Sequence, residues 1–589
     1  MDKYYRQCIE KAFIDPIRSV VIVDDDYPTT MEVLDARIGE MQSRADTSQK
    51  SWLTEPQPVK KVISEFRDGS RPFILDIHDA QTMTENDEIE GAAHLHQTDL
   101  LILDYELDRD KSGDFSRSLL VAKRLMSNAH FNLIIVNTNN DLGPVFQNFL
   151  LGLLFPICEP LSDDDNNALE EAYGEIGTID NFDSLLGEAF GFDQYVSIWN
   201  DYKLSMRELM GGNASFARAK TFFEGANLHK KYWKVMAKSA LHSYQEECVA
   251  KNIMNTEELN IRGFSNGNEV KWIRSDRAFM TFAHKPDGKQ LLECLQLALE
   301  DWNPKPSRLV LTKMLAEIDE HGVEMQGDTL QDDHSSALWY EGILNADDNQ
   351  RKTKVDETVE RHVDGMLARL LPAVQNYTND LAVNEKDTGK TSAEIIKDHY
   401  RIDLSVKKDR DSAELSHNAL VCTQAIRGWH IQTGHIFELD NSFWVCVSPL
   451  CDTVPKQIPA TQRKLQGDRL RFNALKLHKK TKNKLPERVQ SNRYVFLKTG
   501  DSTEVYSITE NTEAMPEIGI FFAGSEGIFQ DNMELSISRA EENQGSKQLV
   551  IRSYNTKVIA HLRYEYALNL INRLGVALTR VGLDFAGDS

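Results

Sequence analysis

The sequence predicts a multidomain protein of three parts: a doubly wound α/β domain, a mainly helical middle region, and a β-rich C-terminal module that ends in a helix. Short aliphatic runs alternate with amphipathic segments in residues 1–165, and helical spacing of apolar residues dominates residues 166–410. Aromatic and β-branched runs separated by turn residues fill residues 411–589. The length of 589 residues fits about three or four domains.

Composition excludes several classes of protein. The 41% apolar and 27% charged residues rule out collagen-like, wholly disordered and disulfide-scaffold chains. A formal net charge of -24 argues against general adhesion to nucleic acid or to anionic membrane. The seven cysteines form no CxxC pair, no signal-peptide core is present, and the longest apolar run, residues 149–157, is far shorter than the roughly 20 residues that span a bilayer. We therefore expect a cytoplasmic protein.

The first part contains five candidate strands, at residues 19–23, 73–77, 99–103, 132–136 and 153–158. Continuous aliphatic runs without polar alternation are typical of strands buried on both faces. Amphipathic helices are predicted between them, at residues 59–67 and 116–126. Strands that alternate with helices predict a parallel, doubly wound sheet.

The other two parts have different patterns. The middle region carries helical spacing at residues 204–209, 232–250, 291–302 and 355–371, interrupted by two strand-like pieces at 270–273 and 278–282. The last part contains strand patterns at residues 436–439, 443–447, 494–497, 504–508 and 548–551, which predict a small antiparallel sheet or barrel. A helix at residues 564–581 closes it.

Acidic residues follow two of the predicted strands. Asp24, Asp25 and Asp26 end the first strand, and Asp104 ends the third. Parallel strands deliver their carboxyl ends to one edge of the sheet, where such folds bind ligands. Converging carboxylates repel one another unless a cation joins them, and Mg²⁺ prefers oxygen ligands. Thr138 adds a hydroxyl at the end of the fourth strand, so the pattern predicts phosphoryl transfer to a carboxylate assisted by Mg²⁺.

The segments VVIVDDD, LLILDYELDRDKSG and LIIVNT resemble the first, third and fourth strands of a response-regulator receiver domain, which has a flavodoxin-like fold. The resemblance implies that Asp104 is the phosphoacceptor and that Asp24 and Asp25 hold Mg²⁺ together with it. It also implies that the backbone carbonyl of Glu106 completes the metal shell and that the Thr138 hydroxyl turns toward the acyl phosphate. Any catalysis would be limited to the protein's own phosphorylation and dephosphorylation.

Two features depart from the family pattern. Asp25 and Asp104 are 79 residues apart, which indicates an insertion within residues 26–72. The predicted fifth strand is followed by Glu159-Pro160, where the family has a lysine before the proline. A glutamate there would oppose the phosphoryl oxygens. Either another cation such as Lys111 or Lys123 replaces the lysine, or the domain is phosphorylated poorly, or it is a degenerate pseudo-receiver that serves as a scaffold.

A basic segment stands out in the C-terminal part. Residues 463–488 contain ten basic and two acidic side chains, among them Lys476, Lys479, Lys480, Lys482 and Lys484. Such a concentration of charge could bind the phosphates of nucleic acid. The alternative is an exposed basic loop or a docking face for acidic protein surface, because stacking aromatic residues are nearly absent.

Residues 433–452 and 562–585 are similar to C-terminal parts of large receiver-containing proteins from bacterial phage-defence operons, phosphorelay systems of the Detocs kind among them. That similarity implies a partner histidine kinase and an adaptor role toward an effector protein. The sequence thus predicts a phosphoacceptor in a bacterial phosphorelay, with a pseudo-receiver scaffold and a nucleic-acid-binding regulator as the alternatives.

Overall fold

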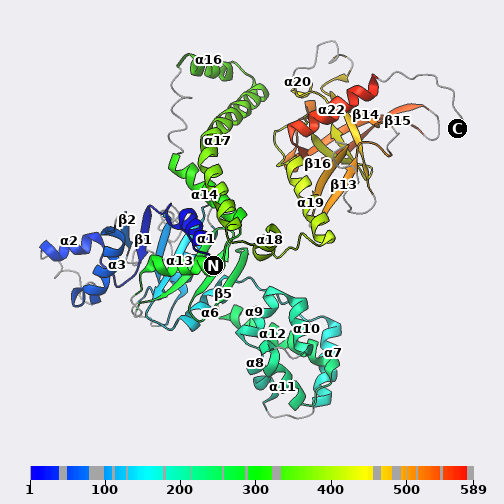
Figure 1. Ribbon diagram of the computed structural model, residues 1–589. Helices are drawn as coiled ribbons and strands as arrows, with labels where there is room; N and C mark the ends of the chain where they lie inside the picture. Colours follow the sequence, from blue (N-terminus) through cyan, green and yellow to red (C-terminus); the bar gives the residue numbers. More distant parts are fainter. Residues whose placement is uncertain are drawn as a thin grey trace. The chain divides into compact units, whose positions relative to one another are not determined.

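The computed structural model divides into two compact units, residues 1–313 and 314–589 (Figure 1). It describes residues 2–579 except for 39–49, 70, 79–97, 109–112, 128–129, 177–180, 212–213, 252, 255–257, 286–288, 322–332, 456–463, 465, 481–492, 501, 512–514 and 544–547. None of the described helices is long and apolar enough to cross a membrane.

The first unit is built on a seven-stranded sheet of order β2-β1-β3-β4-β7-β6-β5. The strands are β1 (Ser19–Val23), β2 (Ile74–His78), β3 (Leu100–Asp104), β4 (Asn132–Thr138), β5 (Ile261–Asn266), β6 (Lys271–Ser275) and β7 (Ala278–His284). Strands β2, β1, β3, β4 and β7 are parallel, whereas β6 pairs antiparallel with β7 on one side and with β5 on the other. The parallel part has the flavodoxin-like order, which confirms the predicted fold class.

Helices cover the sheet because strand residues alternate between its two faces. In β3, Leu101 and Leu103 join one buried cluster with residues of α5 (Ser116–Ser127) and α6 (Leu142–Leu153). The remaining helices of the sheet domain are α1 (Lys3–Ile9), α2 (Thr30–Ile38), α3 (Gln57–Arg67), α13 (Leu291–Trp302) and α14 (Pro306–His321). Of these, α3 contacts β2 and α13 contacts β6 and β7.

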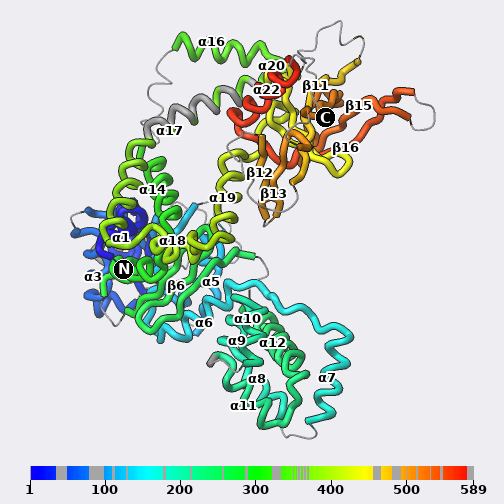
Figure 2. The backbone as a smooth tube through the Cα atoms, turned by 45° about the vertical axis from the view of Figure 1, so that its right-hand side comes forward, coloured from blue at the N-terminus to red at the C-terminus, as the bar shows by residue number. Residues whose placement is uncertain are grey.

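A helical insertion lies between α6 and β5 in the chain. It consists of α7 (Asp163–Ile176), α8 (Phe182–Ala189), α9 (Phe192–Asn200), α10 (Tyr202–Gly211), α11 (Ala217–Gly225) and α12 (Trp233–Ala250), which gather in one cluster (Figure 2). Gln245 of α12 is buried, and its Oε1 accepts hydrogen bonds from the backbone N–H groups of Ile157 and Cys158 at 2.9 and 2.8 Å. The insertion is therefore anchored to the segment that follows α6.

The prediction of a fifth strand at residues 153–158 is wrong. The apolar run there begins as the buried end of α6, and residues 154–162 contain no helix or strand. A short buried run does not by itself distinguish a helix from a strand, which is the source of the error. The fifth parallel strand is β7, the strand-like piece expected at residues 278–282, so the sheet extends beyond the expected boundary at residue 165.

The second unit contains helices and a β-rich module. Its helices α16 (Asp333–Leu344), α17 (Asp348–Lys386), α18 (Ser392–Tyr400) and α19 (Lys407–Cys422) precede the strands. The strands are β8 (Thr423–Gln424), β9 (His435–Leu439), β10 (Ser442–Cys446), β11 (Leu470–Lys479), β12 (Tyr494–Thr499), β13 (Ser502–Ser507), β14 (Ile518–Ala523), β15 (Glu534–Glu542) and β16 (Leu549–Leu562). The closing helix is α22 (Tyr564–Leu578), as predicted.

The module is barrel-like because its sheet returns on itself. Pairing runs in the order β10-β9-β16-β15-β14-β11, and β11 pairs again with β10. Aromatic side chains fill one of its cores, where the ring of Phe521 lies 5.4 Å from that of Phe437 and 5.1 Å from that of Trp444. The predicted β-rich C-terminal module with a closing helix is confirmed, and of the two predicted forms, sheet or barrel, it is barrel-like.

Candidate functional site

Three carboxylates converge at the carboxyl edge of the parallel strands. Asp24 and Asp25 follow β1, and Asp104 is the last residue of β3. One oxygen of each lies within 4.8 Å of the others. Strands β1 and β3 are neighbours at the point where the strand order reverses, which is where doubly wound sheets bind ligands. The structure thus brings together the acids that the sequence predicts as the metal site.

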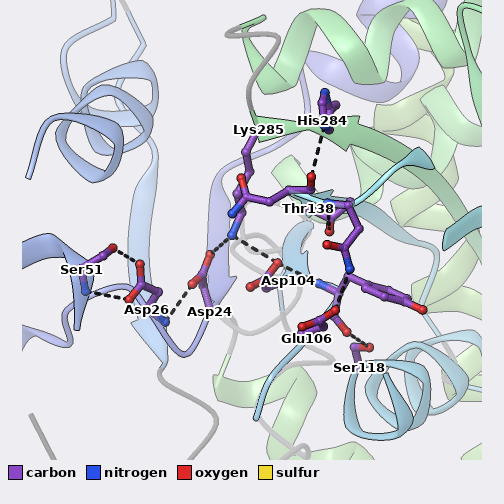
Figure 3. Close-up of polar contacts among 12 residues, drawn as sticks. Asp24, Asp26, Ser51, Asp104, Glu106, Ser118, Thr138, His284 and Lys285 are labelled. Atoms are coloured by element: carbon purple, nitrogen blue, oxygen red, sulfur yellow. Dashed lines mark hydrogen bonds and ion pairs between the residues drawn. The ribbon is translucent and has the colours of Figure 1, made fainter. Parts of the chain in front are cut away.

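The fourth acid in the neighbourhood, Asp26, has a different role. Its Oδ1 accepts a hydrogen bond from the backbone N–H of Ser51 at 2.8 Å, and its Oδ2 is hydrogen-bonded to the Ser51 hydroxyl (Figure 3). Its own backbone N–H donates to Asp24 Oδ1 at 2.9 Å. Asp26 therefore fixes the loop after β1 and orients Asp24, while its carboxylate is engaged with Ser51.

Lys285 supplies the positive charge of the site. Its Nζ lies 2.8 Å from Asp24 Oδ2 and 3.2 Å from Asp104 Oδ1, so that it bridges the two carboxylates (Figure 3). Lys285 directly follows β7, whose pairing with β4 aligns His284 with Thr138. In the sequence the fifth parallel strand is thus followed by a lysine and a proline, the pair that the resemblance to receiver domains leads us to expect there.

The surroundings raise the pKa values of both Asp104 and Lys285. Burial raises the pKa of the Asp104 carboxyl well above its usual range, the charge of Asp24 raises it further, and Lys285 opposes both effects. Burial by itself would lower the pKa of Lys285, but the carboxylates of Asp24 and Asp104 hold that pKa above its ordinary value. Lys285 therefore remains a cation at neutral pH.

The donor set fits a hard divalent cation. Asp24, Asp25 and Asp104 are three carboxylates against one ammonium, which leaves two uncompensated negative charges when all are ionised. A divalent cation would balance that charge, and buried carboxylate oxygens are the ligands that Mg²⁺ prefers. The side chains of Asp24 and Lys285 are 4% and 18% exposed, so bulk water screens these charges poorly.

The predicted switch residue and the predicted carbonyl ligand lie at the same edge. Thr138 ends β4 and is 2% exposed, and its hydroxyl accepts a hydrogen bond from the Asn140 backbone N–H at 3.1 Å. The Asn140 side-chain amide donates to Glu106 Oε1 at 2.6 Å. This pair of bonds links the loop after β3 to the loop after β4, beside Asp104 (Figure 3).

A cavity of about 610 Å³ opens beside the carboxylates. Its lining includes Lys285 and Asn137 at the sheet edge, Tyr27 from the loop after β1, and Lys61 and Glu65 from α3. The cavity is large enough for a small phosphorylated molecule or for a side chain of a docking protein.

The inference drawn from Glu159 is corrected. Glu159 is exposed in the segment after α6 and does not follow a strand of the sheet. The cation of the site is Lys285 and neither of the two lysines named as replacements, of which Lys123 lies in α5 and Lys111 lies outside the described residues. The sequence signal for it was the Lys285-Pro286 pair directly after the strand-like piece at residues 278–282.

Three described lysines of the basic segment contact the chain's own acceptors. Lys476 lies 3.2 Å from Glu517 and Lys479 lies 2.6 Å from Glu504. Lys480 donates to the backbone carbonyls of Thr509 and Glu510. Lys482 and Lys484 lie outside the described residues. These contacts favour a structural role for the first three lysines over a phosphate-binding surface.

Comparison with known proteins gives one match. Residues 16–181 match the family model of the response receiver domain. No curated protein and no solved structure matches the chain. The matched segment ends before β7, so the strand and the lysine that complete the site lie beyond it in the sequence.

Proposed function

Because this chain contains a response-regulator receiver domain, we propose that it is a phosphoacceptor in a bacterial phosphorelay and receives a phosphoryl group on Asp104 from a histidine kinase. The observation that carries the proposal is the bridge from Lys285 to Asp104 and Asp24, beside Asp25. This arrangement supplies a nucleophile, a metal-binding set and a cation within one buried site.

The proposed reaction transfers a phosphoryl group from a histidine of the kinase to the carboxylate of Asp104. A carboxylate oxygen of Asp104 forms the new bond to phosphorus, and the bond from phosphorus to the donor's imidazole nitrogen breaks. Asp24, Asp25 and Asp104 would hold Mg²⁺ with the Glu106 carbonyl, and the bound ion would neutralise charge on the phosphoryl oxygens. Lys285 stabilises the same oxygens, because Asp104 loses its negative charge on acylation and frees the ammonium to turn to them.

The signal would leave the site through Thr138. Its hydroxyl can donate to the acyl phosphate in place of its present contact, and α6 begins only four residues later. Helix α6 contacts β5, β6 and β7, and the insertion is anchored directly after it. We infer that the middle region and the β-rich module read this change and pass it to an effector protein.

The biological setting is inferred from resemblance alone. Residues 433–452 and 562–585 resemble parts of phage-defence phosphorelay proteins of the Detocs kind, which supports a cytoplasmic role in antiviral defence with a histidine kinase as partner. The pseudo-receiver alternative loses its main support, because it rested on Glu159 in the position that Lys285 takes.

Transfer of labelled phosphate tests the proposal. The full chain is incubated with Mg²⁺ and autophosphorylated histidine kinases from the same genome, and the label on the chain is followed over time. We expect label that hydroxylamine releases, that a chelator prevents, and that Asp104→Asn abolishes. Label that persists in Asp104→Asn, or that resists hydroxylamine, would refute the assignment of Asp104.

A further inference from the structure

Two arginines lie at the edge of the first unit's sheet opposite the phosphoacceptor. Arg274 is in β6, one residue before its end, and Arg308 is in the first turn of α14. Arg308 lies against Phe131, the residue before β4, and Arg274 pairs with Phe279 near the start of β7. The length of β7, seven residues or about 23 Å, separates this edge from the edge that carries Lys285.

Aromatic rings hold both guanidinium groups in place. The guanidinium carbon of Arg308 lies 4.3 Å from the ring centre of Phe131, and that of Arg274 lies 5.0 Å from the ring centre of Trp302. Phe13 joins the two supports, with its ring 6.0 Å from Phe131 and 5.5 Å from Trp302. Stacked in this way, each guanidinium presents its donors at low cost in side-chain entropy.

The positive charge of this pair is not balanced by the described residues around it. Asp276 is the nearby acid, and Arg262 already binds it through two hydrogen bonds of 2.8 and 2.7 Å. Arg274 donates one hydrogen bond, from Nη2 to the Arg262 carbonyl at 3.2 Å. Within the described part of the chain, neither Arg274 nor Arg308 forms an ion pair, and the buried Nε of each donates no hydrogen bond. Three guanidinium groups against one carboxylate leave two positive charges.

Without a bound anion, the two neighbouring arginines destabilise the folded protein. Burial lowers the pKa of Arg274, and the charge of Arg308 lowers it further. Helix α14 has no acidic residue in its first turn, so its positive end faces the same region without compensation. A buried donor without a partner and a pair of like charges each destabilise a fold, and binding of an anion relieves the repulsion between the like charges.

We propose that Arg274 and Arg308 bind the phosphate group of a small phosphorylated ligand. A phosphate monoester carries close to two negative charges at neutral pH, which matches the two uncompensated guanidinium groups, whereas a carboxylate would neutralise only one. Its three terminal oxygens suit two planar arginine forks, the geometry in which arginine binds phosphate. The site is independent of phosphorylation at Asp104.

Isothermal titration calorimetry tests this site. The full chain is titrated with inorganic phosphate and, separately, with glycerol 3-phosphate. The titration is done in chelator, where the net negative charge of the Asp24, Asp25 and Asp104 cluster repels phosphate. We expect both probes to bind and glycerol to give no signal. Arg274→Gln and Arg308→Gln should each raise Kd by about tenfold or more, because each removes a charge-assisted bidentate contact. Lys251→Gln changes an exposed lysine that pairs with Glu247, and it should leave Kd unchanged.

Arg308→Lys separates binding from folding. It keeps the charge and the aliphatic stem but loses the planar fork, so we expect weaker phosphate binding with an unchanged melting temperature. This variant decides the question if the glutamine variants do not fold. The proposal is overturned if the wild-type chain binds neither probe, if the arginine variants bind as tightly as the wild type, or if Lys285→Gln alone abolishes binding.

Discussion

Lys285 and Asp24 are 261 positions apart in the sequence, and 2.8 Å separates the lysine Nζ from the aspartate Oδ2. The helical insertion and the β5–β6 hairpin lie between them in the chain, and pairing of β7 with β4 brings the two residues together. The site therefore depends on strand pairing across most of the first unit, and substitutions at Lys285 probe it directly.

Lys285→Gln should slow phosphorylation of Asp104 by a small phosphodonor by roughly 10- to 100-fold, because it removes a preorganised cation from the transferring oxygens. Lys289→Gln, which removes an exposed lysine from the cavity wall, should have little effect. Glu159→Lys should also leave the rate unchanged, since Glu159 is not at the end of a sheet strand. Rates come from intact-mass spectrometry over time, and faster labelling of Glu159→Lys would contradict the structure.

Asp104→Asn should stabilise the protein at neutral pH without Mg²⁺. The folded-state pKa of Asp104 is raised, so the folded chain binds this proton more tightly than the unfolded chain. Its contribution to stability is therefore greatest below the unfolded pKa, near 4, and falls as pH rises toward the folded pKa. Relative to the wild type, Asp104→Asn should raise the free energy of unfolding by on the order of 1 kcal/mol at neutral pH and should leave it unchanged in acid.

Melting temperatures measured across this pH range check the sign. Glu159→Gln is the matched control, because it makes the same chemical change at an exposed site and should show no pH-dependent difference from the wild type. A gain for Asp104→Asn that grows as the pH falls would show that the carboxyl is not destabilised by its surroundings.

Mg²⁺ should raise the melting temperature of the wild-type chain and have no effect on Asp25→Ala, which lacks one ligand. Binding at a hundredfold excess over Kd would add about 2.7 kcal/mol to the free energy of unfolding. Asp26→Ala should retain the Mg²⁺ response, since the Asp26 carboxylate is engaged with Ser51. Glu106→Gln should retain it too, because only a backbone carbonyl is assigned to the metal there. Equal responses in Asp25→Ala and the wild type would exclude this site.

Thr138→Val should leave the phosphorylated fraction nearly unchanged but abolish the change in hydrogen exchange of α6 that phosphorylation causes. The substitution preserves shape and removes the hydroxyl that we expect to turn toward the acyl phosphate. Hydrogen–deuterium exchange across residues 142–153, with and without phosphorylation, provides the measurement. Thr281→Val is the control, because the Thr281 hydroxyl donates to the Lys271 carbonyl within the sheet. Wild-type exchange changes in Thr138→Val would remove Thr138 from the signalling route.

The sequence was sufficient for the features that depend on local pattern. Strands β1, β3 and β4 are aliphatic runs buried on both faces, so their identity and the meeting of Asp24, Asp25 and Asp104 at one edge could be predicted. The position of β7 could not, because its partner β4 lies across the helical insertion and local periodicity carries no information on such pairing. Glu159-Pro160 resembled the family pair only because the buried end of α6 imitated a strand.

Mapping the phosphorylated residue tests the central claim most directly. The full chain is phosphorylated with a small phosphodonor and Mg²⁺, reduced with borohydride, which converts an aspartyl phosphate to homoserine, and digested for peptide sequencing by mass spectrometry. The site built by Asp24, Asp25, Lys285 and Asp104 predicts homoserine at position 104 alone, and its loss in Lys285→Gln at short times. Homoserine at another aspartate, or an unmodified position 104 in a chain that has taken up phosphate, would contradict the account.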